Sequence, residues 1–97
     1  MIRHVVMFSW ADDVDEAHVE RVSAALDTLP SEIREIVRYA HGSDLALVDG
    51  NHDYAVVGDF ESVDDYAAYR DHPAHRAFIA DLIAGRVAER AAVQFEL

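Results

Sequence analysis

Apolar residues follow two different patterns along this chain, and the first pattern predicts strands. Residues 2–10 contain an uninterrupted apolar run from Val5 to Phe8, which is typical of a strand with apolar side chains on both faces. Alternation places His4, Val6 and Phe8 on one face of this strand and Val5 and Met7 on the other. Residues 54–60 have the same character, and we predict further strands at 36–41 and 91–97.

The second pattern, a helical periodicity, predicts helices between these strands. Apolar residues recur at intervals of three and four from Val19 to Leu29, after an acidic run at 12–16 and before Pro30, which indicates a helix of about four turns. Ser62, followed by acidic residues, is typical of the start of a second helix. Pro73 disfavours helix at the residue before it and opens a further helix through Ile83.

The resulting order, β-α-β-β-α-β with a split second helical region, indicates a ferredoxin-like α+β fold. Such a fold has a four-stranded antiparallel sheet with helices on one face only. The other face then carries Val5, Met7, Ala55 and Val57, and a chain of this size does not leave so large an apolar surface in water. We therefore expect a homodimer.

Composition narrows the class of protein. The 97 residues form one domain, 1–97, with 52% apolar residues and a mean hydropathy of -0.05. There is no apolar run of membrane-spanning length and no signal-peptide pattern, so we expect a cytoplasmic protein without a membrane partner. The formal charge of -11 argues against nucleic acid as a partner. The absence of cysteine and lysine excludes thiolate and lysine Schiff-base chemistry.

Candidate chemistry is concentrated in residues 69–75, which read Tyr-Arg-Asp-His-Pro-Ala-His. Phe78, Ile79 and Leu82 follow His75 at the spacing of one helical stripe, so His75 is predicted to point inward. An inward histidine is either a hydrogen-bonded structural residue or an acid-base group, and both remain open. Tyr69, one turn before the break, supplies a phenol to the same cavity.

The other histidine of this segment, His72, is expected to face solvent or to bond the backbone at the helix start. His72 and His75 stand three residues apart beside Asp71, but Pro73 redirects the chain between them, so no zinc site is expected. The chain has no glycine-rich phosphate loop, serine elbow or nucleotide fingerprint. No cofactor is therefore expected.

Four segments together resemble the stress-responsive dimeric α/β-barrel (Dabb) family over essentially the whole chain. They are His4-Val5-Val6-Met7-Phe8, Asp59-Phe60-Glu61-Ser62, Tyr69 with His72-Pro73-Ala74-His75, and Gln94-Phe95-Glu96. The resemblance implies a homodimeric α+β barrel in which two sheets face each other.

Within that family the chain is similar to the olivetolic acid cyclase-like polyketide cyclase branch, where a tyrosine and a histidine drive an intramolecular aldol condensation. The motifs assign these roles to Tyr69 and His75. The resemblance also implies an apolar or phenolic small molecule in a pocket between sheet and helices, with Arg70 near its mouth. The lining residues that it implies are His4, Val6, Phe8, Val22, Leu26, Val56 and Phe78.

Three functions remain open from the sequence. In the first, neutral His75 removes a proton α to a carbonyl and Tyr69 bonds the developing enolate. His4 orients His75, binds a substrate oxygen or is a structural residue, and all three roles remain open. In the second, the protein is a non-catalytic stress-responsive or ligand-binding dimer. In the third, it is a cofactor-independent monooxygenase that uses Trp10 and Tyr66.

Overall fold

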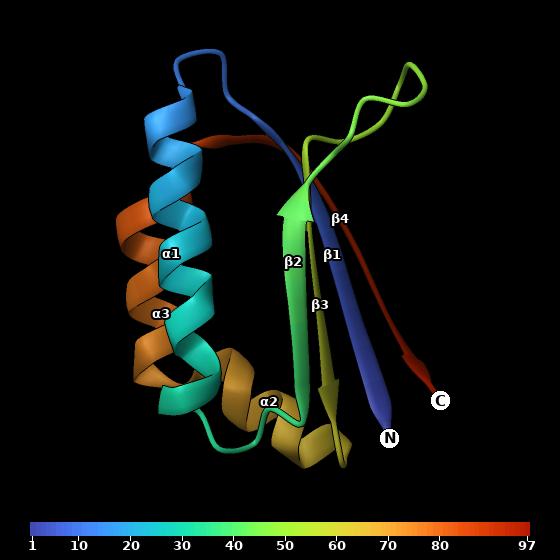
Figure 1. Ribbon diagram of the computed structural model, residues 1–97. Coiled ribbons are helices and arrows are strands. Elements are labelled where there is room, and N and C mark those ends of the chain that lie inside the picture. Colours follow the sequence, from blue (N-terminus) through green and yellow to red (C-terminus); the bar gives the residue numbers. More distant parts are fainter.

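A single antiparallel sheet with helices on one side makes up the computed structural model, which describes residues 1–97 (Figure 1). The strand order is β2-β3-β1-β4. This is the ferredoxin-like fold predicted above. Its elements are β1 (Ile2–Trp10), α1 (Glu16–Glu32), β2 (Arg38–Ser43), β3 (Tyr54–Phe60), α2 (Val63–Asp71), α3 (Pro73–Phe78), the π-helical turn η1 (Ile79–Ile83) and β4 (Val87–Glu96).

The predicted bounds of three elements were wrong. Helix α1 continues past Pro30 to Glu32, because a proline in the last turn removes only one backbone donor, and the Ile33 N–H still closes the helix on the Leu29 carbonyl at 2.8 Å. Strand β2 starts and ends two residues later than predicted, since Gly42 and Ser43 pair with β3 despite their low strand propensity.

The third correction concerns β4, which begins at Val87 rather than at residue 91. Residues 88–90 are Ala-Glu-Arg and lack the apolar alternation on which the prediction relied. They nevertheless pair with β1, where Arg90 lies opposite Phe8 and Val87 opposite Trp10. Pairing with a long central strand therefore overrides the weak local pattern.

Helix starts follow the predicted capping chemistry. The side chains of Asp15 and Ser62 accept hydrogen bonds from backbone N–H groups in the first turns of α1 and α2. His72 does the same for α3, where its Nδ1 accepts from the Ala74 N–H at 3.1 Å. His72 thus bonds the backbone, as expected, and its ring orients the helix that carries His75.

The core lies between the helix-bearing face of the sheet and α1. Val22, Leu26 and Phe60 have at most 1% of their surface exposed. The sheet register places His4, Val6 and Phe8 on this face together with the residues opposite them on β3 and β4. No helix of the structure is long and apolar enough to span a membrane.

The other face of the sheet bears no helix (Figure 1). Met7, Val93 and Phe95 are 39%, 55% and 45% exposed there. Beyond it, the loop of residues 44–53 extends away from the helices and carries exposed Leu45 and Leu47. The uncovered apolar face predicted from the sequence is therefore present.

Candidate functional site

A cavity of about 200 Å³ lies between the sheet and the helices α2 and α3. The wall is mostly apolar and is lined by eight of the nine residues that the sequence assigned to the site: His4, Val6, Phe8, Leu26, Val56, Tyr69, His75 and Phe78. The ninth, Val22, was placed wrongly. It is 0% exposed and packs in the core, because neighbouring side chains leave it no free surface.

His75 presents a free ring nitrogen to this region. Its Nδ1–H donates to the Arg70 carbonyl oxygen at 3.0 Å, since a carbonyl only accepts, and Nε2 therefore carries the lone pair. His75 Nε2 makes no hydrogen bond within the protein. Every fully buried side-chain nitrogen of the protein does make one, so Nε2 is not fully buried and is accessible. Burial lowers the pKa of His75 below 6.5, and the charge of Arg90 acts in the same direction. The ring is accordingly a neutral base at neutral pH.

Tyr69 lies directly beside this base. The two ring centroids are 4.4 Å apart, and Tyr69 is 2% exposed. Burial raises the pKa of Tyr69 to about 12, so its hydroxyl keeps its proton. The Tyr69 hydroxyl also lies 2.7 Å from that of Tyr39. When Tyr39 donates in this pair, the Tyr69 proton is free for a ligand.

Tyr39 is a site residue that the sequence analysis missed. Strand β2 places it opposite Gly58, on the helix-bearing face. A Cβ at Gly58 would meet the rings of Phe60 and Tyr39 at 3.1 and 3.2 Å, so this glycine leaves the room that the Tyr39 ring needs. Tyr39 lies within the strand predicted at 36–41, but alternation alone does not say which face of that strand meets the helices.

His4 supplies a second polar group to the wall. The Gln94 side-chain amide donates to His4 Nδ1 at 2.8 Å, which leaves Nε2–H as a donor. Burial lowers the pKa of His4 to about 4, with smaller effects of Arg90 and His75, so the ring is neutral at neutral pH. His4 makes no hydrogen bond to His75 and does not orient it. Binding of a ligand oxygen remains as its chemical role.

Six further residues line the cavity: Tyr66, Arg70, Ile79, Ile83, Val87 and Arg90. Of these, the resemblance had implied only Arg70, near the mouth of the pocket. The wide turn η1 presents its first and last residues there. Val87 and Arg90 belong to the part of β4 that the sequence pattern did not reveal. Trp10, in contrast, is not part of the cavity wall. Its ring packs on that of Phe8, with the two ring centroids 4.9 Å apart.

A larger hollow, of about 560 Å³, lies against the helix-free side of the sheet under the 44–53 loop. Met7, Leu45, Leu47 and His52 are among its lining residues. His52 Nδ1 is within 2.9 Å of the Ser9 hydroxyl. Because this hollow lies on the uncovered face of the sheet, whereas the smaller cavity lies between the sheet and the helices, we place the candidate site in the smaller cavity.

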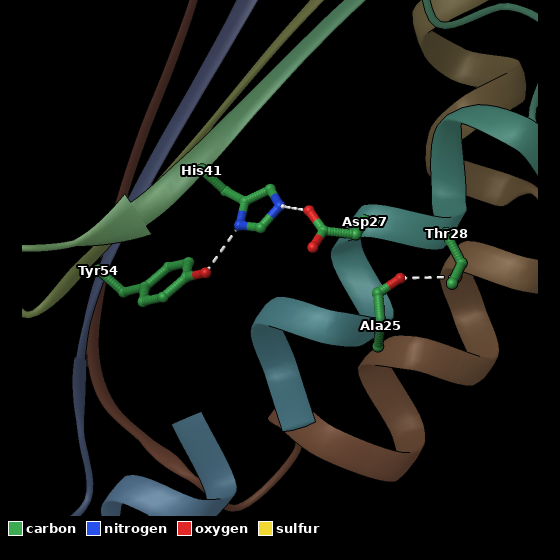
Figure 2. Close-up of polar contacts among 5 residues, drawn as sticks. All are labelled: Ala25, Asp27, Thr28, His41 and Tyr54. Atoms are coloured by element: carbon green, nitrogen blue, oxygen red, sulfur yellow. Dashed lines mark hydrogen bonds and ion pairs between the residues drawn. The ribbon is translucent and has the colours of Figure 1, made fainter. Parts of the chain in front are cut away.

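A second polar cluster joins α1 to the sheet outside the cavity (Figure 2). His41 Nε2–H donates to Asp27 Oδ1 at 2.7 Å, and His41 Nδ1 accepts from the Tyr54 hydroxyl at 2.8 Å. Tyr54 is 2% exposed, whereas the Asp27 side chain is 71% exposed. The cluster thus satisfies a buried phenol and ties β2 and β3 to α1.

We expect the His41→Ala variant to lose about 1–3 kcal/mol of unfolding free energy, because the buried Tyr54 hydroxyl loses its acceptor. Urea titration followed by circular dichroism measures the change. Asp27→Ala is the matched control and should cost less than about 1 kcal/mol, since the Asp27 carboxylate that accepts the His41 hydrogen bond is 71% exposed to solvent. Equal losses in the two variants would contradict this assignment.

No group of three or more histidine and carboxylate side chains is arranged to hold a metal ion. His72 is used as a helix cap and His75 bonds a carbonyl oxygen. The polar residues that line the cavity are His4, His75, Tyr39, Tyr66, Tyr69, Arg70 and Arg90.

Comparison with family models gives one match, to the stress responsive A/B barrel domain over residues 2–97. No curated protein matches the sequence. Among solved structures, a dimeric ferredoxin-like protein of unknown function from Thermobifida fusca YX is 50% identical, with a TM-score of 0.92 and coverage of 99% of this chain and 90% of that one.

Two more distant structures share the fold. A dimeric protein of unknown function from Bacteroides fragilis NCTC 9343 is 27% identical, with a TM-score of 0.84 and coverage of 99% of this chain and 95% of that one. The hydroxynitrile lyase of Passiflora edulis is 16% identical, with a TM-score of 0.86 and coverage of 99% and 92%. At that identity the likeness concerns the fold alone.

Proposed function

The chain belongs to the stress responsive A/B barrel family, and we propose that it is a homodimeric, cofactor-independent enzyme that removes a proton from the carbon beside a carbonyl group of a small apolar substrate. The observation that carries this proposal is the neutral His75 ring, with Nε2 accessible, packed against the buried ring of Tyr69 in the wall of an apolar cavity. A base with a pKa near working pH and a donor in a dry site are the two components that enolate chemistry needs.

The residues have distinct roles in the proposed reaction. His75 Nε2 takes the α-proton, and the electron pair of the C–H bond becomes the enolate. The Tyr69 hydroxyl, supported by Tyr39 at 2.7 Å, donates to the enolate oxygen, and His4 Nε2–H is a second donor. In the aldol form of the reaction, the enolate carbon attacks a second carbonyl of the same molecule, and the His75 imidazolium returns its proton to the resulting alkoxide.

Cavity size limits the substrate. An apolar cavity of about 150 Å³ is known to hold benzene. The cavity of this protein, about 200 Å³, therefore accommodates a molecule the size of one substituted ring, or a short chain that folds into one. Larger polycyclic substrates are not expected to bind without widening of the cavity.

The test is proton exchange in heavy water with acetophenone, a single-ring ketone with an α-methyl group. The enzyme proposal expects deuterium to enter that methyl group faster with the protein than with buffer alone, as followed by NMR. Binding without exchange, by a folded protein and across a panel of small ketones, would instead support the second candidate, a non-catalytic ligand-binding dimer.

Oxygenation through Trp10 and Tyr66 has less support, because Trp10 is not in the cavity wall.

The dimer part of the proposal rests on the helix-free face. Exposed Met7, Val93 and Phe95 form an apolar surface there, and the relative at 50% identity is described as dimeric. Because the 44–53 loop extends beyond this face, its exposed Leu45 and Leu47 would pack on the partner subunit (Figure 1). Pairing two such faces buries both surfaces and closes the barrel.

Replacing Met7 by Glu is expected to convert the dimer to a monomer of 10.8 kDa, because two carboxylates would be buried against each other in the interface. Multi-angle light scattering measures the mass. The matched control is Ala24→Glu on α1, an exposed position on the helix-bearing side of the sheet that should leave the dimer intact. An unchanged mass of Met7→Glu would refute face-to-face pairing.

A further inference from the structure

The charge of the cavity wall contrasts with that of the whole molecule. The chain has 19 acidic and 8 basic residues, for a formal charge of -11. The fifteen residues that line the cavity include two arginines, Arg70 and Arg90, and no aspartate or glutamate. An acidic protein that excludes carboxylates from one apolar cavity is complementary there to a negatively charged ligand.

The two arginines differ in their availability. Arg70 is held by Asp71 through two hydrogen bonds, at 3.0 and 2.9 Å. Arg90 has no carboxylate within ion-pair distance, since it appears in none of the five ion pairs of the structure. Its guanidinium is therefore the uncommitted cation at the edge of the cavity, with its full set of donors available.

Strand register directs Arg90 toward the site. It lies opposite Phe8 on β4, on the same face as the cavity-lining side chains of β1. It is also close enough for its charge to lower the pKa of both His4 and His75. A planar guanidinium at this position can bind a carboxylate through two parallel hydrogen bonds while the rest of the ligand occupies the apolar space.

We propose that the ligand of this cavity is a small carboxylic acid in its ionised form, with its carboxylate on Arg90 and its apolar body between the sheet and α3. That this ligand is a substrate rests on the proposed function. The substrate then combines a carboxylate with a carbonyl group, so its chemical class is the keto acids. The carbonyl then lies toward the buried Tyr69 and His4 side chains, and the carboxylate toward the exposed Arg90.

The experiment compares benzoate with benzamide, which have the same shape and differ in charge. Binding is measured by proton–nitrogen correlation NMR at the backbone signals of cavity-lining residues, at constant ionic strength. The proposal expects benzoate to bind about tenfold more tightly than benzamide. In Arg90→Gln the affinity for benzoate should fall to that for benzamide, and the affinity for benzamide should not change.

The matched control is Arg76→Gln, an exposed arginine of α3 that does not line the cavity and should leave both affinities unchanged. Equal binding of the two probes, a benzoate preference that persists in Arg90→Gln, or failure of benzoate to shift cavity signals would each overturn the inference. Neither probe has an exchangeable α-hydrogen, so the result is independent of catalysis. A preference for benzoate without ketone exchange would reject the proposed enzyme and keep carboxylic acids as the ligand class. Ketone exchange without a preference for benzoate would keep the proposed enzyme and reject this ligand class.

Discussion

The His75→Gln variant is expected to lose catalysed α-proton exchange by about 10²–10⁴-fold in kcat/KM, the usual contribution of a positioned general base. Glutamine can still donate a hydrogen bond to the Arg70 carbonyl, which His75 bonds at 3.0 Å, so the local fold should be retained. The measurement is the initial rate of deuterium incorporation into acetophenone, with circular dichroism as the check on folding.

The pH profile of the unmodified protein gives the control. The base must be neutral to act, and burial lowers the pKa of His75 from its ordinary 6.5. Activity should therefore be complete at neutral pH and fall as the pH drops through that lowered pKa, which places the acidic limb below 6.5. Full activity of His75→Gln, or an acidic limb above 6.5, would show that another group is the base.

Tyr69→Phe is the second large effect expected. Removing one preorganised donor to a developing oxyanion typically costs about 10²–10³-fold in kcat. The substitution keeps the buried ring, whose centroid lies 4.9 Å from that of Phe60, and removes only the hydroxyl. The readout is kcat for ketone exchange, because a donor used mainly in the transition state affects kcat more than KM.

Two further tyrosines calibrate this result. Tyr39→Phe should lower kcat by a smaller factor, about tenfold, since Tyr39 acts through the Tyr69 hydroxyl at 2.7 Å. Tyr66→Phe is the matched control: it lines the same cavity and makes no hydrogen bond to Tyr69, so its kcat should be unchanged. If all three variants behave alike, the Tyr69 hydroxyl has no specific role in the reaction.

Some parts of the site could be predicted because they depend on local chemistry. Pro73 disfavours helical backbone at the residue before it, so His72 as a cap and His75 on the next helix follow from the sequence. Alternation along a nine-residue strand likewise determines which face His4 and Phe8 share. These inferences need no knowledge of the neighbouring elements.

Other parts depend on contacts between distant segments. Tyr39 reaches Tyr69 across 30 residues of sequence, and Arg90 enters the site because a polar stretch pairs with β1. Val22 and Leu26 have the same periodicity and both lie in the core, but only Leu26 also lines the cavity. A pattern along one element cannot distinguish these outcomes.

The sequence by itself determined the order of the elements, the helix breaks and the two faces of the central strand, because propensity, capping and alternation act over a few residues. Only the tertiary structure decided that Tyr69 has a second phenol behind it, that His75 exposes Nε2, and that Arg90 is left without a carboxylate. These depend on the register of strands and the packing of helices, which bring together groups that are remote in the chain.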